Sequence, residues 1–366
     1  MHKLNKITIR GFKSIRSLSL ELRPINVLIG ANGSGKSNFI EAFTFLRAVS
    51  EGKLANYVQR KGGAERLIHF GSKHTSEMRF HLYFDESVNQ YEIALEPTVI
   101  DNLIPTEEAA YYWNRAYPAP YREGLSFLGL EARIGQPGLT GVPSYVHDAL
   151  SSWRVYHFHD TGPSSPLKKV SDLDDNRFLR GDGSNLAAFL YLLKEQHESE
   201  YKLIVDTIRR IAPFFVDFIL QPRALNEETI RLEWSHKGAD TYFDISDFSD
   251  GTLRFIALTT LLFQPKKYKA SVILLDEPEL GLHPSAIAVL GAMIRQASSE
   301  VQIIVSTQSP LLLDAFDPED VLVVDRMEGT SSFTRLQNHA LASWLSEYSL
   351  GELWEKNEIG GRPGGN

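Results

Sequence analysis

The residues best suited to chemistry lie near the start of the chain, where Gly30–Ser37 reads GANGSGKS and fits the pattern GxxxxGK[ST]. Glycines at these positions let backbone N–H groups turn toward phosphate oxygens without an intervening Cβ. Lys36 can reach the β- and γ-phosphates of a nucleotide, and the Ser37 hydroxyl can ligate Mg²⁺. The spacing therefore predicts a phosphate-binding loop made of Gly30, Ala31, Asn32, Gly33, Ser34, Gly35, Lys36, Ser37 and Asn38.

A second candidate site lies far downstream, where the segment SVILLDEP ends in Asp276 and Glu277. Two ionised carboxylates are costly inside a strand, so their position at its end indicates ligands. We expect Asp276 to hold Mg²⁺ through water and Glu277 to orient and polarise an attacking water. Such a pair also occurs at strand ends by accident, and it is the phosphate-binding loop that favours the functional interpretation.

With these two motifs identified, two further segments become candidates for nucleotide contacts. Ser249 and Gly251 precede a predicted helix, where they would form another anion site, although taken alone they are an ordinary helix cap. The predicted strand Val301–Val305 runs into STQSP, which contains Gln308. A glutamine can hydrogen-bond a phosphate or a water, but it carries no proton that titrates near neutral pH.

The elements that position these residues follow from hydrophobic patterning. INVLIG is apolar throughout, which suits a strand buried on both faces, and a helix is predicted from Asn38 to Val49. Residues 185–211 are predicted to be helical, with Pro213 as the stop. Further predicted elements are strands at Leu18–Leu22, near Phe218, at Thr229–Trp234, in SSWRVYHFHD and in VLVVD, and helices after Ser249 and at 285–298.

Taken together, the segments GFKSI, NVLIGANGSGKSNFIEA, FSDGTLR and LLDEPELGLHPSA resemble ABC-type ATPases of the RecF and SMC group. Within that group the sequence is similar to the RecF-like, SMC-like predicted ATPases of bacteria. The resemblance is specific at both ends of the chain and weak in the middle. It implies an α/β, ABC/SMC-head-like P-loop NTPase fold with a mixed central sheet. An N-terminal antiparallel β-rich lobe, a short helical insertion and no long coiled coil complete the expected fold.

The resemblance also implies roles for the residues. ATP and Mg²⁺ are the expected cofactors, and Ser249 and Gly251 match a degenerate SxG signature that would contact the γ-phosphate bound to another subunit. Gln308 occupies a switch position that usually holds histidine, so either hydrolysis is expected to be slow or the chain is expected to act mainly as an ATP-gated switch. The expected catalytic residues are Glu277, Lys36 and Gln308, and the expected metal ligands are Ser37 and Asp276.

Several assignments stay open at this point. The segment Glu279–His283 falls at the D-loop position, where His283 is interpreted as structural rather than catalytic. Gln59 is one candidate for the Q-loop glutamine, and Arg60 and Arg254 are candidate phosphate contacts. His157 and His159 alternate on one face of a predicted strand, which is a usable metal-ligand geometry. The sequence supplies no third ligand, so the structural interpretation is kept.

Composition narrows the class of protein. Lys and Arg total 38 against 46 Asp and Glu, a net charge of −8, which excludes a uniformly basic nucleic-acid coat but not a local basic patch. Cysteine is absent, which excludes disulfides, thiolate zinc sites and a cysteine nucleophile. No apolar run reaches the roughly 18 residues of a membrane span, and no signal segment is read, so a cytoplasmic protein without a membrane partner is expected.

The expected organisation is an ATPase head interrupted by insertions. Its segments are 1–50 with the phosphate-binding loop, 51–165 rich in β structure, 166–215 helical, 216–335 with the signature, Asp276–Glu277 and switch motifs, and 336–366 with a C-terminal helix and a disordered tail.

The sequence favours Mg-dependent ATP binding and hydrolysis by heads that assemble as a homodimer or higher homo-oligomer around ATP. Such a protein would gate DNA repair or a separately encoded effector, as in phage defence. DNA contact would use the pairs Lys168–Lys169 and Arg209–Arg210 with the lysines at 266, 267 and 269. Relatives in the OLD family carry a nuclease domain after the ATPase, whereas too few residues follow Gln308 here, so we expect any nuclease to be a partner. The alternative is an ATP-stabilised scaffold with little turnover that regulates a separate nuclease or toxin.

Overall fold

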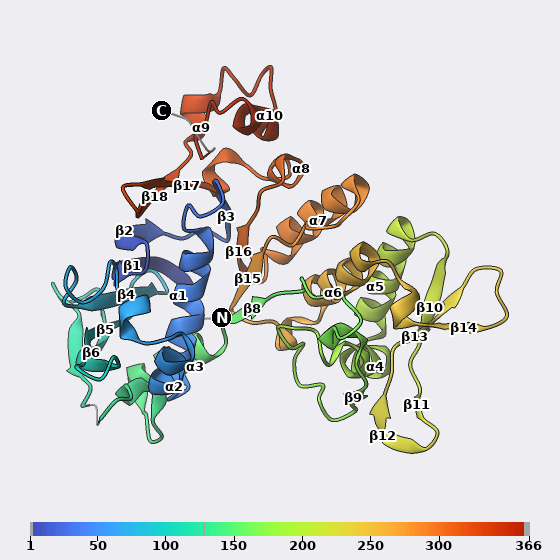
Figure 1. Ribbon diagram of the computed structural model, residues 1–366, viewed down its shortest axis with the longest axis horizontal. Helices are drawn as coiled ribbons and strands as arrows, with labels where there is room; N and C mark the ends of the chain where they lie inside the picture. Colours follow the sequence, from blue (N-terminus) through green and yellow to red (C-terminus); the bar gives the residue numbers. More distant parts are fainter. Residues whose placement is uncertain (1–2, 127–128, 362–366) are drawn as a thin grey trace. The chain divides into compact units, whose positions relative to one another are not determined.

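The computed structural model describes residues 3–126 and 129–361 (Figure 1). The chain divides into two compact units. Unit 1 comprises Met1–Val155, Pro318–Tyr348 and Glu352–Asn366, and unit 2 comprises Tyr156–Asp317 and Ser349–Gly351. The tail predicted to be disordered falls largely on residues 362–366, which lie outside the described residues.

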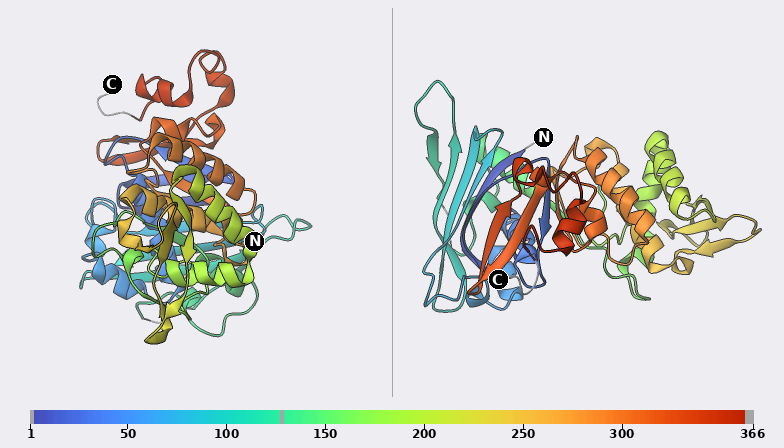
Figure 2. Two further views of the ribbon diagram at one scale, coloured as in Figure 1. Left: turned by 90° about the vertical axis from the view of Figure 1, so that its right-hand side faces the viewer. Right: turned by 90° about the horizontal axis from the view of Figure 1, so that it is seen from above.

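Unit 1 contains the predicted antiparallel lobe, a six-stranded sheet in the order β2-β1-β4-β5-β6-β7 (Figures 1 and 2). Burial alternates strictly along β4, so that one face of the strand is apolar. The helix α1 (Lys36–Ser50) packs on this face through Phe45, whose ring lies 5.7 Å from Phe12 and 5.4 Å from Phe80. The strands are β1 (Leu4–Phe12), β2 (Ile15–Glu21), β4 (Met78–Phe84), β5 (Asn89–Pro97), β6 (Leu103–Tyr112) and β7 (Tyr121–Gly124).

A second group of strands in unit 1 carries the phosphate-binding loop. β3 (Ile25–Ile29) is buried at every position, as its apolar sequence predicts, and it pairs in parallel with β17 (Val321–Met327). β17 also pairs in antiparallel fashion with β18 (Thr330–Arg335), so the arrangement is mixed. The remaining helices with residues in this unit are α2 (Leu54–Arg60), α3 (Gly141–Ser151), α9 (Asn338–Leu341) and α10 (Leu350–Glu355), the last of which begins in unit 2.

Unit 2 is built on the parallel pair β15 (Val272–Asp276) and β16 (Gln302–Ser306), which α7 (Pro284–Ala297) connects. Parallel strands need such a crossover, and a helix is its usual form. α6 (Asp250–Phe263) packs between α7 and α5 (Glu198–Ile211). The other helices are α4 (Leu186–Gln196), which packs on α5, and α8 (Pro310–Leu313), which packs on α7.

Short strands complete unit 2. They form two three-stranded sheets, in the orders β10-β13-β14 and β11-β12-β9. The strands are β9 (Ser171–Asp172), β10 (Phe215–Ile219), β11 (Pro222–Arg223), β12 (Asn226–Ile230), β13 (Glu233–His236) and β14 (Tyr242–Asp244).

Three local predictions are wrong, and one is incomplete. The helical stretch 185–211 is broken at His197, whose φ of −140° and ψ of 58° leave the helical region. The single strand expected at Thr229–Trp234 is divided between β12 and β13. β8 (Arg154–Tyr156) ends before His157, so the two histidines do not share a strand. The segment 51–165 is predicted to be rich in β structure with long connections, and the structure adds the helices α2 and α3 there.

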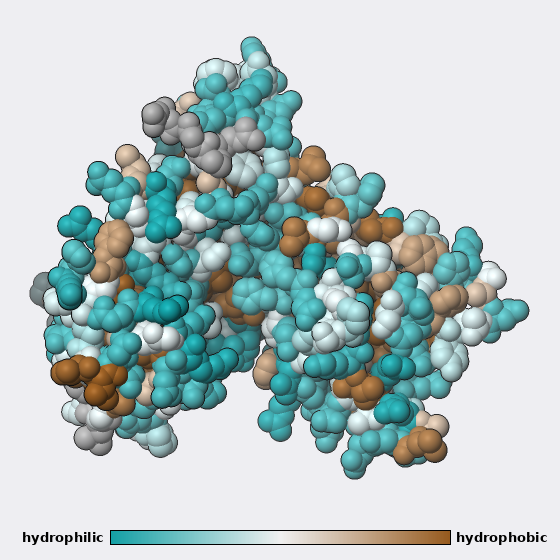
Figure 3. Space-filling view, viewed as in Figure 1, coloured by the Kyte–Doolittle hydropathy of each residue, from teal (hydrophilic) through white to brown (hydrophobic). Residues whose placement is uncertain are grey.

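The sequence predicts neither a membrane-spanning segment nor a long coiled coil. No helix in the described part of the chain is long and apolar enough to cross a membrane. Hydrophilic side chains cover most of the face drawn in Figure 3, and apolar side chains appear on it in separate groups. α1, with 15 residues, is the longest helix among the described residues, so no long coiled coil is present there.

Candidate active site

The phosphate-binding loop of unit 1 is held from beneath by a serine far away in the sequence. Gly35 has a φ of +118°, and a Cβ there would come within 2.0 Å of the Ser331 hydroxyl oxygen, so only glycine fits. The Ser331 hydroxyl donates to the carbonyl of Ser34 at 2.5 Å and contacts the Ser14 hydroxyl at 2.7 Å. These bonds fix the end of the loop where α1 begins.

The start of α1 is suited to an anion. Gly35 is its N-cap residue, and no side chain caps the first turn. The first N–H groups of a helix lack partners within the helix, and the helix dipole adds positive potential there. Ser37 lies exposed in this turn, and the Lys36 side chain is buried, with its Nζ donating to the carbonyls of Gly30 at 2.6 Å and Ala31 at 3.0 Å. The ammonium group therefore lies at the loop, as the motif predicts.

A pocket of about 380 Å³ lies next to this loop in unit 1. Phe70 stands at the pocket with 56% of its surface exposed and a φ of +56°, which is rare for a bulky residue. Residues with backbone strain of this kind cluster at binding sites. The pocket is lined by Lys13, Ser14, Asn38, Glu65, Arg66, Ile68, Phe70, Gly71, Arg326 and Gly329.

The two adjacent carboxylates of unit 2 lie where β15 ends. Asp276 is the last residue of the strand and is half-buried. Glu277 has a φ of +44°, an uncommon conformation, and its N–H donates to the carbonyl of Ser306 at 2.8 Å. The Gln308 side-chain amide donates to Glu277 Oε1. The structure thus brings together Glu277 and Gln308, two of the three predicted catalytic residues.

A third carboxylate, Glu279, organises the same region and was not singled out from the sequence. It is buried, and its Oε1 accepts from the Thr307 hydroxyl at 2.6 Å and from the Gln308 N–H at 3.1 Å. Its Oε2 has no hydrogen-bond partner in the part of the chain that the structure describes. Burial raises the pKa of Glu279, and the nearby Glu277 acts in the same direction, whereas the two hydrogen bonds lower it. No local pattern distinguishes this glutamate from an exposed one.

The predicted signature begins α6. Ser249 is the N-cap residue, and its hydroxyl accepts from the Thr252 N–H at 3.2 Å. The preceding Phe248 is buried and stacks on Trp234 with ring centroids 4.3 Å apart. A Cβ on Gly251 would lie 2.4 Å from the carbonyl oxygen of Gly281, so glycine lets the signature pack closely on the segment Glu279–His283.

The remaining residues singled out from the sequence differ in burial and in hydrogen-bond partners. Gln59 and Arg60 are both exposed on α2 of unit 1. Arg254 is buried in α6 and donates to the carbonyls of Phe158 at 2.8 Å and of residue 159 at 3.1 Å, and burial lowers its pKa. His283 caps α7 through Nδ1, which accepts from the N–H of residue 285 at 3.3 Å, in line with its structural interpretation.

Two families of known proteins match separate parts of the chain. Residues 2–108 match the AAA ATPase domain, and residues 144–314 match the family described as "AAA domain, putative AbiEii toxin, Type IV TA system". The chain is 26% identical to the Old nuclease of Escherichia phage P2 over an alignment 359 positions long, which covers 86% of this chain and 57% of that protein. It is 27% identical to the DNA replication and repair protein RecF of Haemophilus ducreyi over 164 residues, 43% of this chain and 39% of that protein.

Among solved structures, the chain is similar to the Smc head domain with an extended coiled coil bound to the C-terminal domain of ScpA, derived from Pyrococcus furiosus. The TM-score is 0.61 at 17% identity, and the likeness covers 95% of this chain and 99% of that one. This likeness shows the fold: an α/β, SMC-head-like P-loop architecture with mixed strand pairing and an antiparallel N-terminal sheet.

The fold and the matched families confirm the resemblance to RecF-like and SMC-like ATPases with an ABC-type head. That class implies nucleotide binding. The chain spans less than two thirds of the length of the curated relatives compared above.

Proposed function

We propose that the chain binds Mg·ATP and hydrolyses it. The observation that carries the proposal is the phosphate-binding loop of unit 1. The loop contains a glycine at φ +118°, it ends at a helix start that no side chain caps, and the Lys36 ammonium donates to its backbone. The adjoining pocket has the volume of a small-molecule site. We propose that it receives the nucleoside, with the Phe70 ring against the base and Arg66 and Arg326 near the sugar and phosphates.

The residues proposed for the metal fit Mg²⁺. Magnesium prefers oxygen ligands and keeps several waters. The Ser37 hydroxyl is exposed at the start of α1, and the Asp276 carboxylate is half-buried at the end of β15, so each side chain offers an oxygen donor. When bound, Mg²⁺ would neutralise charge that develops on the phosphate oxygens.

The chain's own side chains would carry the proton and charge transfers. Lys36 would bind the β- and γ-phosphates, and Glu277 would accept the proton of the attacking water. The water oxygen bonds to the γ-phosphorus while the bond to the bridging oxygen breaks, giving ADP and phosphate. Gln308 would orient Glu277 through the hydrogen bond between their side chains.

The test is to separate binding from turnover. Lys36→Ala should weaken ATP binding about 10- to 100-fold, because it removes a charged hydrogen-bonding group from the phosphates. Glu277→Gln should keep ATP binding and lower phosphate release about 100-fold or more, because the proton acceptor is lost. Binding is measured by calorimetry and turnover by phosphate release, with the exposed replacements Lys53→Ala and Glu195→Gln as controls. Unchanged ATP affinity in Lys36→Ala would contradict the proposal.

A finer part of the proposal is assembly around ATP. The RecF and SMC resemblance supports heads that face one another, so that the Ser249–Gly251 signature of one chain contacts the nucleotide of another. Ser249 is exposed at the start of α6, as such a contact requires. In light scattering, Glu277→Gln with saturating Mg·ATP should double its mass, because bound ATP is not removed. The same protein with Ser249→Arg should stay monomeric, and an unchanged mass in Glu277→Gln itself would rule out this assembly.

The physiological role that we propose is ATP-dependent gating of DNA repair or of a separate effector protein. The names of the relatives, a nuclease and a DNA replication and repair protein, support work linked to DNA. A broad basic patch for DNA has weaker support from the surface charges. Lys269 pairs with Glu300 at 2.6 Å, and Arg209 pairs with Asp206 at 2.8 Å, so both cations are partly neutralised. Binding to duplex DNA that falls steeply with salt would favour direct DNA contact.

A scaffold with little turnover is the second candidate. It is supported by the hydrogen bond from Gln308 to Glu277, which occupies one oxygen of the proposed proton acceptor. In this case ATP-dependent assembly would persist while phosphate release stays undetectable in the wild-type protein.

A further inference from the structure

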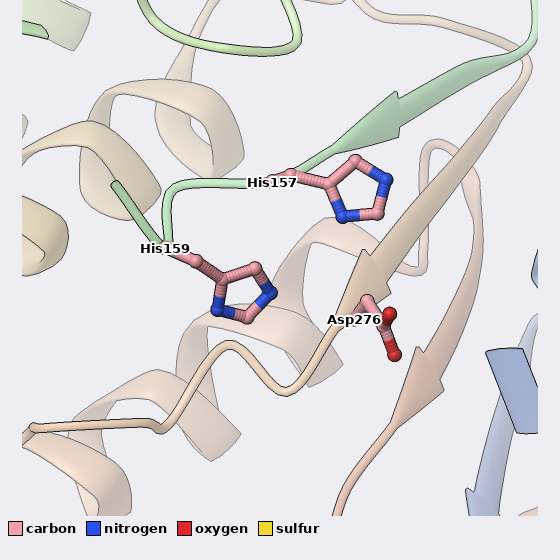
Figure 4. A group of neighbouring side chains, drawn as sticks. All are labelled: His157, His159 and Asp276. Atoms are coloured by element: carbon pink, nitrogen blue, oxygen red, sulfur yellow. The ribbon is translucent and has the colours of Figure 1, made fainter. Parts of the chain in front are cut away.

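A cluster of metal-ligating side chains lies in unit 2. His157, His159 and Asp276 each offer one ligand atom, and these atoms all lie within 4.8 Å of one another. Figure 4 shows both imidazole rings extending from the chain toward the strand end that bears Asp276. We propose that these three residues bind a divalent transition-metal ion, of the class of Mn²⁺, Fe²⁺, Co²⁺ or Zn²⁺.

The donor set determines the class of metal. Two imidazole nitrogens and one carboxylate oxygen suit borderline first-row transition ions, whereas Mg²⁺ and Ca²⁺ take oxygen ligands. Three protein ligands also leave coordination positions open for water or for a phosphate oxygen. In the chain without nucleotide, the histidines thus give an ion at Asp276 a preference for transition metals over Mg²⁺ that the carboxylate alone does not supply.

The geometry allows a shared ion after a small adjustment. Nitrogen and oxygen ligands lie about 2.1 Å from such ions, so two ligands of one ion are at most about 4.2 Å apart. A pair at the 4.8 Å limit must therefore approach by roughly half an ångström, which rotation of an imidazole provides. His157 and His159 lie at the chain's exit from β8, where such rotation does not disturb a strand.

The surroundings favour a cation. A cavity of about 10 Å³, close to the volume occupied by one water probe, is lined by His159, Asp276, Glu277 and Arg254 among others. Its carboxylates outnumber its one guanidinium, so a cation reduces the net charge. Arg254 donates to the carbonyls of Phe158 and His159, which holds the histidine segment in place rather than competing for the carboxylate.

Metal binding by these three residues does not depend on ATP hydrolysis. All three ligands belong to unit 2, and binding of the metal can be measured without nucleotide. Lys36→Ala, which should lose ATP binding, is expected to keep metal binding. A failure of the ATPase proposal and a failure of this one are therefore distinguishable.

The experiment is a titration of the untagged full chain with Co²⁺, followed by its visible absorption, without nucleotide. The wild-type protein should bind one Co²⁺, and His157→Ala and His159→Ala should each weaken binding tenfold or more. His147→Ala is the matched control, because His147 also lies beside a carboxylate, that of Asp148 at 3.2 Å, on the surface of α3. A hundredfold excess of Mg²⁺ should displace little Co²⁺.

A second measurement decides the matter if a variant fails to fold. Pulsed electron paramagnetic resonance of the wild-type protein with Mn²⁺ should show coupling to imidazole ¹⁴N. Absence of this coupling in bound Mn²⁺, equal Co²⁺ affinity in both histidine variants, or displacement of Co²⁺ by equimolar Mg²⁺ would each overturn the proposal.

Discussion

At the scale of single residues, three carboxylates lie close to the end of β15 and differ in how deeply they are buried. Asp276 and Glu277 are half-buried, whereas Glu279 is buried and has one oxygen without a hydrogen-bond partner among the described residues. A buried carboxylate with one oxygen left without a hydrogen-bond partner is destabilising when it is ionised. Here Glu279 holds Thr307 and the backbone of Gln308, which positions the glutamine that contacts Glu277.

This setting predicts a pH dependence of stability. Because burial raises the pKa of Glu279, the folded chain keeps this proton to a higher pH than the unfolded chain does. The stabilising contribution of the protonated form is complete below the ordinary pKa of 4.5 and is lost as pH rises through the folded-state pKa. Glu279→Gln has no such loss. Urea unfolding should therefore show the wild-type free energy of unfolding, relative to the variant, falling from pH 4.5 toward neutral pH, and a constant difference would contradict this assignment.

At the residue scale, the sequence predicts the positions of candidate residues correctly where the pattern is local. The phosphate-binding loop and the Asp276–Glu277 pair are continuous patterns, and the structure places them at a helix start and a strand end as expected. The support of Gly35 by Ser331, and the approach of the two histidines to Asp276, join segments far apart in the sequence. Such contacts leave no periodic or compositional signal, so the sequence supplied two metal ligands without the third.

At the scale of elements, the start of α6 depends on close backbone packing. Its N-cap residue Ser249 follows Phe248, which is stacked on Trp234, and Gly251 lies against the carbonyl of Gly281. The predicted signature is therefore held by an aromatic cluster on one side and by the Glu279–His283 segment on the other.

A methyl group at Gly251 tests this packing. Gly251→Ala should lower the free energy of unfolding by about 1–3 kcal/mol, because its Cβ would lie 2.4 Å from a backbone oxygen that cannot turn away. Gly162→Ala is the matched control in the same unit, since its Cβ would make only an ordinary contact at 3.5 Å. Denaturant unfolding of both variants is the measurement, and equal stabilities would show that the two segments are not tightly packed.

Element boundaries were predicted less well than element types. The strands β3, β15 and β16 are short apolar runs, which their length and flanking residues identify as buried strands. The break at His197 is different, because no proline or glycine marks it and both flanking segments are good helix formers. A change of direction between α4 and α5 is set by tertiary packing, which local propensity does not encode.

At the scale of the whole molecule, the SMC-head-like fold explains why the chain is long for a single site. The phosphate-binding loop belongs to unit 1, whereas the carboxylates, the switch glutamine and the signature belong to unit 2. The proposed reaction thus requires both units of the chain, and the proposed assembly requires a second chain. Fold and class followed from motifs at the two ends of the sequence, whereas the insertion between them carried no comparable pattern.

Most directly at issue is whether Glu277 is the proton acceptor with which the chain hydrolyses bound ATP to ADP and phosphate. The most direct measurement is phosphate release by wild-type protein and by Glu277→Gln, both with the same fraction of chains occupied by Mg·ATP. We predict turnover in the wild-type protein and ATP that stays bound and intact in the variant. Equal rates of phosphate release in the two proteins would contradict it.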